Sequence, residues 1–231
     1  MKRILRFGFP AYVSVLCFNA FAVTETNAQG ILKDILGRMD SHYKALKSLK
    51  ADVARAQENS QLGAVDNYEG KIVLLPGKGR NFSVRLDWSK PKVEVLSVVK
   101  GQYVLFVPGI KRAYTGSSES KKVSDTGGNV LGTMSMSEAE LKANYDVQFL
   151  GQVKLQGGTD VWHLKLNPKV RAKYKFAELW VDANGMPLQG KVTAWNNDTD
   201  TFRLTKLQKN VSLKGEVFTV SLPPKTEIIK S

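Results

Sequence analysis

Apolar residues first recur every three or four positions along the chain and later at every second position. The first pattern spans residues 31–49 and places six apolar side chains on one side of a helix, with Lys33 and Asp34 away from them. The six are Ile31, Ile35, Met39, Tyr43, Leu46 and Leu49. This spacing predicts one amphipathic helix near the start of the chain.

After residue 50 the pattern becomes that of β-strands. Apolar side chains alternate with polar ones most clearly in residues 82–88, 162–166 and 218–222. Turn sequences separate such runs, among them Pro76-Gly77, Gly157-Gly158 and Asn184-Gly185. Strands with one polar face are typical of an antiparallel sheet that is wet on one side, and a sheet of many strands must curl or close. We therefore predict a single α+β domain over residues 29–231.

One stretch interrupts the strands. Residues 115–133 are rich in Ser, Gly, Thr and Lys, which predicts a mobile loop. Ser137 and Glu140 then have the spacing of a capping box, which predicts a short helix to about Asn144. Met134 and Met136 supply adaptable apolar surface just before this helix. Taken by itself, the stretch is first of all a surface excursion.

The first 28 residues are typical of an export signal. Lys2, Arg3 and Arg6 precede an apolar run from 7 to 21, and small-x-small sites end at Ala22 and Ala28. The run is shorter than the roughly 20 residues that a membrane-spanning helix needs, so a retained anchor is the second interpretation. We expect a signal peptide over residues 1–28, cleaved after Ala22 or Ala28, and a periplasmic protein.

The single cysteine, Cys17, lies within this apolar run. Leu16 precedes it, whereas a lipid-modified export signal needs a small residue at that position. We therefore expect Cys17 to be removed with the signal peptide. The remaining chain then has no disulfide, thiolate nucleophile or thiolate metal ligand, and is not tethered by lipid.

The formal net charge is +13. The positive electrostatic field of such a protein attracts nucleic acid or anionic lipid surfaces. The export signal makes nucleic acid the less favoured of these two partners. The basic residues are also scattered, as on an ordinary solvated surface. We expect no nucleic-acid partner.

The residues that most often carry catalysis are scarce. The two histidines, His42 and His163, fit neither a nucleophile–base order nor a metal-ligand spacing, and each is first of all an ordinary polar position. No glycine-rich stretch forms a phosphate loop. We therefore expect that the protein is not an enzyme and that it binds no cofactor or metal. A bent sheet with one long helix could leave a concave apolar face for acyl chains, worth about 0.8 kcal/mol per buried CH₂.

The order of these segments resembles the bacterial outer-membrane lipoprotein carrier family, the LolA/LolB-like proteins. The resemblance runs through residues 68–72, then 82–91 with its Trp88 and Pro91, and the hairpin at 99–106. It is closest in the second half, at 176–187 and 218–224. The resemblance implies an incomplete, strongly bent β-barrel, covered by the N-terminal helix and a short lid helix.

The resemblance also implies a function: a soluble periplasmic carrier that binds acyl chains of lipoproteins or lipids and delivers them toward the outer membrane. It implies an inner-membrane release complex and an outer-membrane acceptor as partners, and we expect a monomer. The candidate residues of the acyl cavity are Phe82, Leu86, Trp88, Tyr103, Phe106, Trp162, Leu164, Ile35 and Met39. The candidate residues of the lid, at 134–144, are Met134, Met136 and Leu141.

The sequence departs from the family at one position. Leu75 precedes Pro76, where the family places an arginine that holds the lid closed. The departure predicts a lid held mainly by apolar contact. The alternative function is an envelope sensor or regulatory module of the same fold that recognises lipid or misfolded protein. A hydrolase on a β scaffold is disfavoured because no nucleophile–base set is present.

Overall fold

The computed structural model describes residues 25–77 and 82–230. Helix α1 (Glu25–Ala45) leads into the first six strands: β1 (Leu49–Asn59), β2 (Ala64–Leu75), β3 (Ser83–Lys90), β4 (Glu94–Val99), β5 (Gln102–Val107) and β6 (Arg112–Ser117). The helical segments α2 (Lys121–Val123), η3 (Ser124–Gly128), α3 (Asn129–Met134) and α4 (Glu138–Asn144) follow. The rest is β7 (Tyr145–Lys154), β8 (Asp160–Pro168), β9 (Phe176–Val181), β10 (Pro187–Thr193), β11 (Thr199–Lys209), η4 (Gly215–Phe218) and β12 (Glu227–Lys230).

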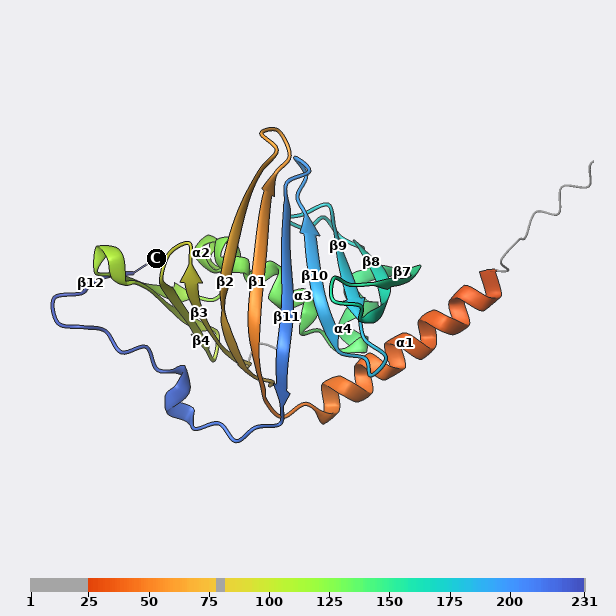
Figure 1. Ribbon diagram of the computed structural model, residues 1–231, viewed down its shortest axis with the longest axis horizontal. Helices are drawn as coiled ribbons and strands as arrows, with labels where there is room; N and C mark the ends of the chain where they lie inside the picture. The colour runs from red at the N-terminus through yellow and green to blue at the C-terminus, as the bar shows by residue number, and fades with distance from the viewer. Residues whose placement is uncertain (1–24, 78–81, 231) are drawn as a thin grey trace, which may run out of the picture.

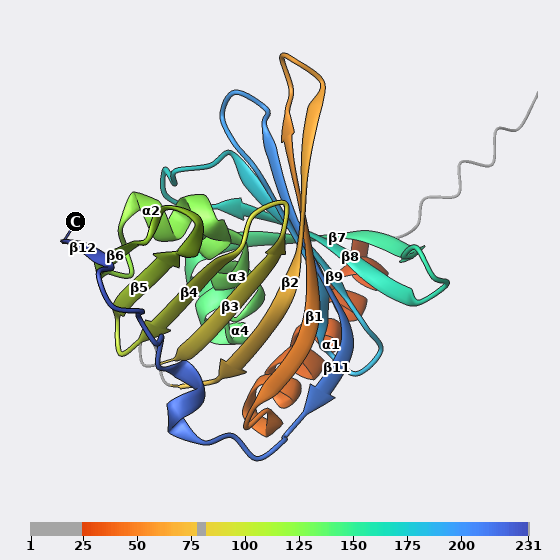
Figure 2. The same cartoon turned by 60° about the vertical axis from the view of Figure 1, so that its left-hand side comes forward.

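All the strands belong to one twisted sheet, in the order β12-β6-β5-β4-β3-β2-β1-β11-β10-β9-β8-β7. The sheet bends around the helical segments α2–α4 without closing, and α1 lies at its open side (Figures 1 and 2). The predicted α+β class and incomplete barrel are confirmed. One pair departs from the antiparallel expectation: β12 runs parallel to β6. A long segment, residues 210–226, joins β11 to β12 at the edge of the sheet beside β6. No hairpin turn therefore fixes the direction of β12.

Helix α1 confirms the predicted amphipathic helix but ends before the last two residues of its apolar series. Ile35 and Met39 are buried against the sheet. Leu46 lies just beyond the helix and Leu49 is the first residue of β1. The predicted signal peptide lies outside the described residues except for 25–28, which form the first turn of α1. None of the described helices is long and apolar enough to cross a membrane.

The prediction of a loop at 115–133 is wrong. Residues 115–117 belong to β6, and residues 121–134 form short helical segments on the concave face of the sheet. Buried Val123 and Val130 anchor these segments, an apolar contribution too sparse to give a helical period. The predicted capping box is confirmed: Ser137 N donates to Glu140 Oε2 at 2.8 Å, and Glu140 N donates to Ser137 Oγ at 3.3 Å. Helix α4 ends at Asn144, as predicted.

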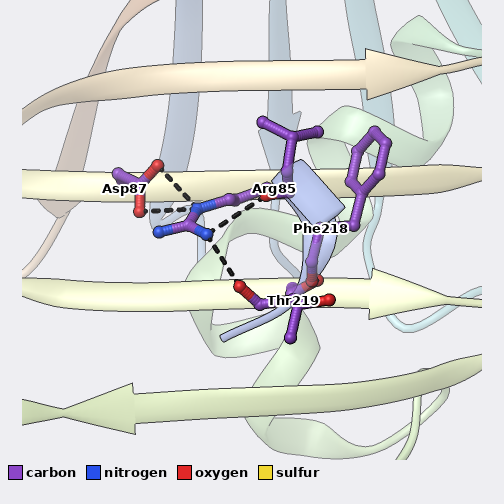
Figure 3. A network of polar contacts seen from close by, with 6 residues as sticks. Arg85, Asp87, Phe218 and Thr219 are labelled. Carbon is purple, nitrogen blue, oxygen red and sulfur yellow. Dashed lines mark hydrogen bonds and ion pairs between the residues drawn. The ribbon is translucent and has the colours of Figure 1, made fainter. Parts of the chain in front are cut away.

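The predicted strand at 218–222 is also wrong. Residues 215–218 form η4, and the chain then crosses the outer face of the sheet in irregular conformation. Its carbonyls are satisfied by side chains instead of a strand: Arg85 Nη1 donates to the Val217 and Thr219 oxygens at 3.1 Å, and Ser97 Oγ donates to the Phe218 oxygen (Figure 3). Pro223 and Pro224, which follow, have no N–H to offer a sheet ladder.

Candidate ligand cavity

A cavity of about 650 Å³ lies between the concave face of the sheet, the C-terminal half of α1 and residues 121–144. We call residues 121–144 the helical insertion. Cavities of 300–1,000 Å³ are the usual size of small-molecule sites, and such sites are mostly apolar. The apolar lining residues are Met39, Leu46, Leu49, Ile72, Leu74, Pro76, Phe82, Val84, Leu96, Val98, Val123, Leu131, Met134, Met136, Met186, Pro187 and Leu204.

The alternation of the strands places these walls. In β3, Val84, Leu86 and Trp88 face inward while Arg85 and Asp87 face outward, as the sequence predicted. The pairing of β3 with β2 and β4 sets Val84 opposite both Leu74 and Val98. Neighbouring strands therefore present a continuous apolar surface to the cavity.

The helical insertion packs closely on the other half of the sheet. Helix α3 lies against β10, with β9 and β11 beside it. Gly190 on β10 makes this approach possible: an added Cβ there would lie 2.7 Å from Met134 Cγ and 3.0 Å from Val130 Cγ1. The absence of a side chain at Gly190 thus sets the depth at which the insertion covers the sheet.

We predict that Gly190→Ala lowers the free energy of unfolding by about 1–2 kcal/mol, because a methyl group must displace Met134 or Val130. Gly37→Ala is the matched control: its added Cβ meets nothing within 4 Å, and in the interior of α1 alanine should stabilise by about 0.5–1 kcal/mol. Urea unfolding of both variants measures the difference. Equal effects would contradict close packing at Gly190.

A polar contact also attaches the insertion to the sheet. The sequence, with Leu75 in place of the family arginine, predicted mainly apolar contacts. Arg55 on β1 is 3% exposed and donates through Nη2 to the Asp125 oxygen at 2.7 Å. The same guanidinium forms a bidentate pair with Asp200, with both N–O distances 2.8 Å. Leu75 itself is exposed at the end of β2. An arginine thus holds the insertion from another position on the sheet.

The polar groups of the cavity lining mostly have partners within the protein. Tyr43 Oη donates to the Gly77 oxygen at 3.2 Å, and Ser135 Oγ donates to the Leu131 oxygen at 2.8 Å. Glu140 Oε2 accepts from Ser137 N, as the capping box requires, and also from Ser137 Oγ. The lining therefore contains several polar side chains, but few of them are free to bond a ligand. Such a lining suits an apolar ligand.

Burial near the cavity shifts two titrations. Burial lowers the pKa of the His42 imidazole, and the charge of Lys209 lowers it further. Burial raises the pKa of the Tyr43 hydroxyl, and the Glu140 carboxylate adds to this shift. Both shifts favour the neutral side chain, so His42 and Tyr43 are uncharged at neutral pH.

The structure brings four of the predicted residues to the cavity: Phe82, Met39, Met134 and Met136. Most of the others are buried in the core behind the lining: Ile35, Leu86, Trp88, Tyr103, Leu164 and Leu141. Two lie elsewhere. Trp162 is half-buried beneath the Arg38 guanidinium, 5.4 Å from the ring centroid. Phe106 is an odd number of positions from Tyr103 in a regular strand, so it faces the opposite side of the sheet.

Sequence reasoning missed most of the sheet wall of the cavity on β1, β2 and β4. Leu49, Ile72, Leu96 and Val98 line it, and none of the four was among the candidate cavity residues. Arg55 was also missed. It follows Leu49, Ala51 and Val53 at every second position of β1, and this alternation could have placed it on the inner face. The two histidines have different surroundings. His42 lines the cavity, whereas His163 forms a hydrogen bond of 2.9 Å with Glu178 and stacks on Trp180.

Solved structures share this fold. An uncharacterized conserved protein from Thermus thermophilus has a TM-score of 0.55 and 12% identity, over 87% of this chain and 99% of that one. MucB has a TM-score of 0.55 and 14% identity, over 88% of this chain and 66% of MucB. This chain thus spans about two thirds of the length of MucB.

A LolA superfamily protein, NE2245 from Nitrosomonas europaea, is also similar, with a TM-score of 0.41 and 15% identity over 81% of this chain and 97% of that one. No family model matches the sequence. No curated protein matches it either.

Proposed function

We propose that this protein is a periplasmic carrier that binds the acyl chains of a lipid or lipoprotein in the cavity and delivers them toward the outer membrane. The observation that carries the proposal is a cavity of about 650 Å³ with apolar walls, covered by a helical insertion. Burial of acyl methylenes in such walls contributes about 0.8 kcal/mol each. The resemblance of the sequence to the LolA/LolB-like family supports it.

In this proposal the helical insertion is the cover that cargo displaces. It lines the cavity. The Arg55 bond, the packing of α3 on β10 and buried apolar residues of the insertion, such as Val123 and Leu141, hold it on the sheet. An inner-membrane donor and an outer-membrane acceptor complete the proposed transfer. The protein acts by binding and release and makes no covalent change to its cargo.

Titration with a fluorescent long-chain acyl probe tests the proposal. We predict that wild type binds the probe and that Met136→Asp weakens binding at least tenfold, because the carboxylate would lie in the apolar lining. Leu150→Asp is the matched control: Leu150 is an exposed residue of β7 outside the lining, and its variant should bind like wild type.

Thermal melts separate a local effect from unfolding. Met136→Asp should keep a cooperative transition, since Met136 lies on the cavity surface and is not fully buried. Probe binding by Met136→Asp equal to that of wild type would contradict the acyl site, as would loss of binding only through collapse of the fold.

A second candidate is a sensor or regulatory module that binds a protein. MucB, whose fold this chain shares, has been crystallised in complex with MucA(peri). This candidate predicts stable capture of a protein partner by a form whose cavity holds no acyl chain. The carrier predicts an acyl species bound to protein purified from the envelope, which native mass spectrometry detects.

A further inference from the structure

We propose that the loop at residues 169–175, together with the turn at 194–198, docks this protein on anionic lipid bilayers. We call these two segments the basic loop surface. The loop joins β8 to β9 and the turn joins β10 to β11, and both lie at the same end of the sheet as the tip of the β1–β2 hairpin (Figures 1 and 2). Docking goes beyond the proposed function and does not depend on it.

Unpaired positive charge is concentrated on the loop. Four of its seven residues are basic, none is acidic, and all four bases are exposed: Lys169, Arg171, Lys173 and Lys175. None of them forms an ion pair within the described part of the chain; the Lys169 ammonium instead donates to the Lys142 oxygen at 2.6 Å. A cluster of unpaired bases attracts an anionic lipid surface, and each base adds about fivefold in affinity.

An aromatic side chain is fixed beside these bases. Trp195 is 55% exposed, and its indole Nε1 donates to the Ala172 oxygen at 3.2 Å. The Arg171 guanidinium lies 5.7 Å from the Trp195 ring centroid. Because the polar atom of the indole is already bonded inside the protein, the exposed part of Trp195 is mainly apolar. Val170, 76% exposed, adds apolar surface among the bases.

This combination suits the interfacial zone of a bilayer. Tryptophan prefers the level of the lipid headgroups, and neighbouring bases meet the anionic phosphates there. The one acid of the turn, Asp198, is engaged by Ser60 N at 2.8 Å and Asn196 Nδ2 at 2.7 Å. These hydrogen bonds hold the pKa of Asp198 below its usual value, so its single negative charge persists but is outnumbered by four bases.

The surface adjoins the candidate cavity. Lys173 belongs to the loop, is exposed, and also lines the cavity. A bilayer bound at the basic loop surface would therefore lie near the cavity, and acyl cargo could pass between membrane and protein there. This role in transfer rests on the proposed function.

Vesicle flotation of the full chain tests the docking. Wild type should bind vesicles that contain one part phosphatidylglycerol to three of phosphatidylcholine, and should bind pure phosphatidylcholine much more weakly. The double variant Arg171→Glu and Lys175→Glu should bind the anionic vesicles at least about 25-fold more weakly, since each removed base is worth about fivefold. Trp195→Ser should reduce binding severalfold at unchanged net charge.

Two control variants match these changes elsewhere on the surface. Lys92→Glu with Lys214→Glu alters net charge equally at exposed bases outside the basic loop surface, and should lower binding only slightly. Ile110→Ser removes an apolar residue that is 55% exposed, as Trp195 is, and should bind like wild type. Thermal melts and acyl-probe titration without vesicles accompany each variant.

The outcomes distinguish the proposals. Loss of vesicle binding with unchanged melting and unchanged probe binding supports docking at this surface. Equal losses in the two charge variants, equal binding to both vesicle types, or no vesicle binding by wild type would overturn it. Failure of the acyl probe to bind wild type, with vesicle binding retained, would overturn the carrier and leave the docking surface intact.

Discussion

Replacement of Arg55 by methionine should lower the free energy of unfolding by about 3 kcal/mol. Removal of one partner of a buried ion pair typically costs about 3–5 kcal/mol, and the lower end applies because the Asp200 side chain is 21% exposed. The variant also loses the hydrogen bond to the Asp125 oxygen and the contacts of the guanidinium with the Tyr68 and Phe202 rings, at 5.2 and 5.3 Å. Chemical denaturation measures the change.

Arg112→Met is the matched control. Arg112 also pairs with a carboxylate, that of Glu227 at 2.8 Å, but both side chains are exposed, so this loss should cost at most about 1 kcal/mol. The double variant Arg55→Met and Asp200→Leu should regain part of the stability, because no unpaired carboxylate is left. A cost for Arg55→Met no larger than that for Arg112→Met would show that the buried pair does not hold the insertion. Hydrogen exchange of residues 121–134 should speed up in Arg55→Met if the bond to Asp125 restrains the insertion.

Gly127→Ala should lower the free energy of unfolding by about 2–4 kcal/mol. Gly127 has φ +99, a left-handed conformation that costs an alanine about 1–2 kcal/mol. Its added Cβ would also overlap the Phe202 ring, with Cζ at 1.9 Å, and this overpacking typically costs about 1–3 kcal/mol. Because Gly127 belongs to η3, the insertion must move away from β11, and acyl-probe affinity should change as well.

Gly132→Ala provides the comparison for this variant. It is the same substitution five positions further along the insertion, in α3, where an added Cβ meets nothing within 4 Å. Alanine there should be neutral or stabilising, by up to about 1 kcal/mol, because it favours the helix. Thermal and urea unfolding of both variants should therefore differ in sign or clearly in size. A Gly127→Ala variant as stable as wild type would mean that the insertion does not pack on Phe202 in this way.

The sequence by itself determined the elements with strong local signals. The apolar period predicted α1, the alternation at 82–88 predicted β3, and the pair Ser137–Glu140 predicted the start of α4. These predictions succeed because helix and strand periods and capping hydrogen bonds involve residues only a few positions apart. The sheet followed from the number of predicted strands, and its failure to close followed from the family resemblance.

Only the tertiary structure decided what the remaining segments do. The alternation at 218–222 matches a strand, but the chain there bonds Arg85 and Ser97 from more than 100 positions away and needs no ladder. Within the polar stretch at 115–133, residues 121–133 form helical segments because Gly127 and Gly190 leave room for them against Phe202 and β10. Periodicity also could not separate residues that line the cavity, such as Phe82, from residues of the packed core, such as Leu86. Both face inward on the same strand pattern, and the curvature of the sheet alone decides where packing ends and empty volume begins.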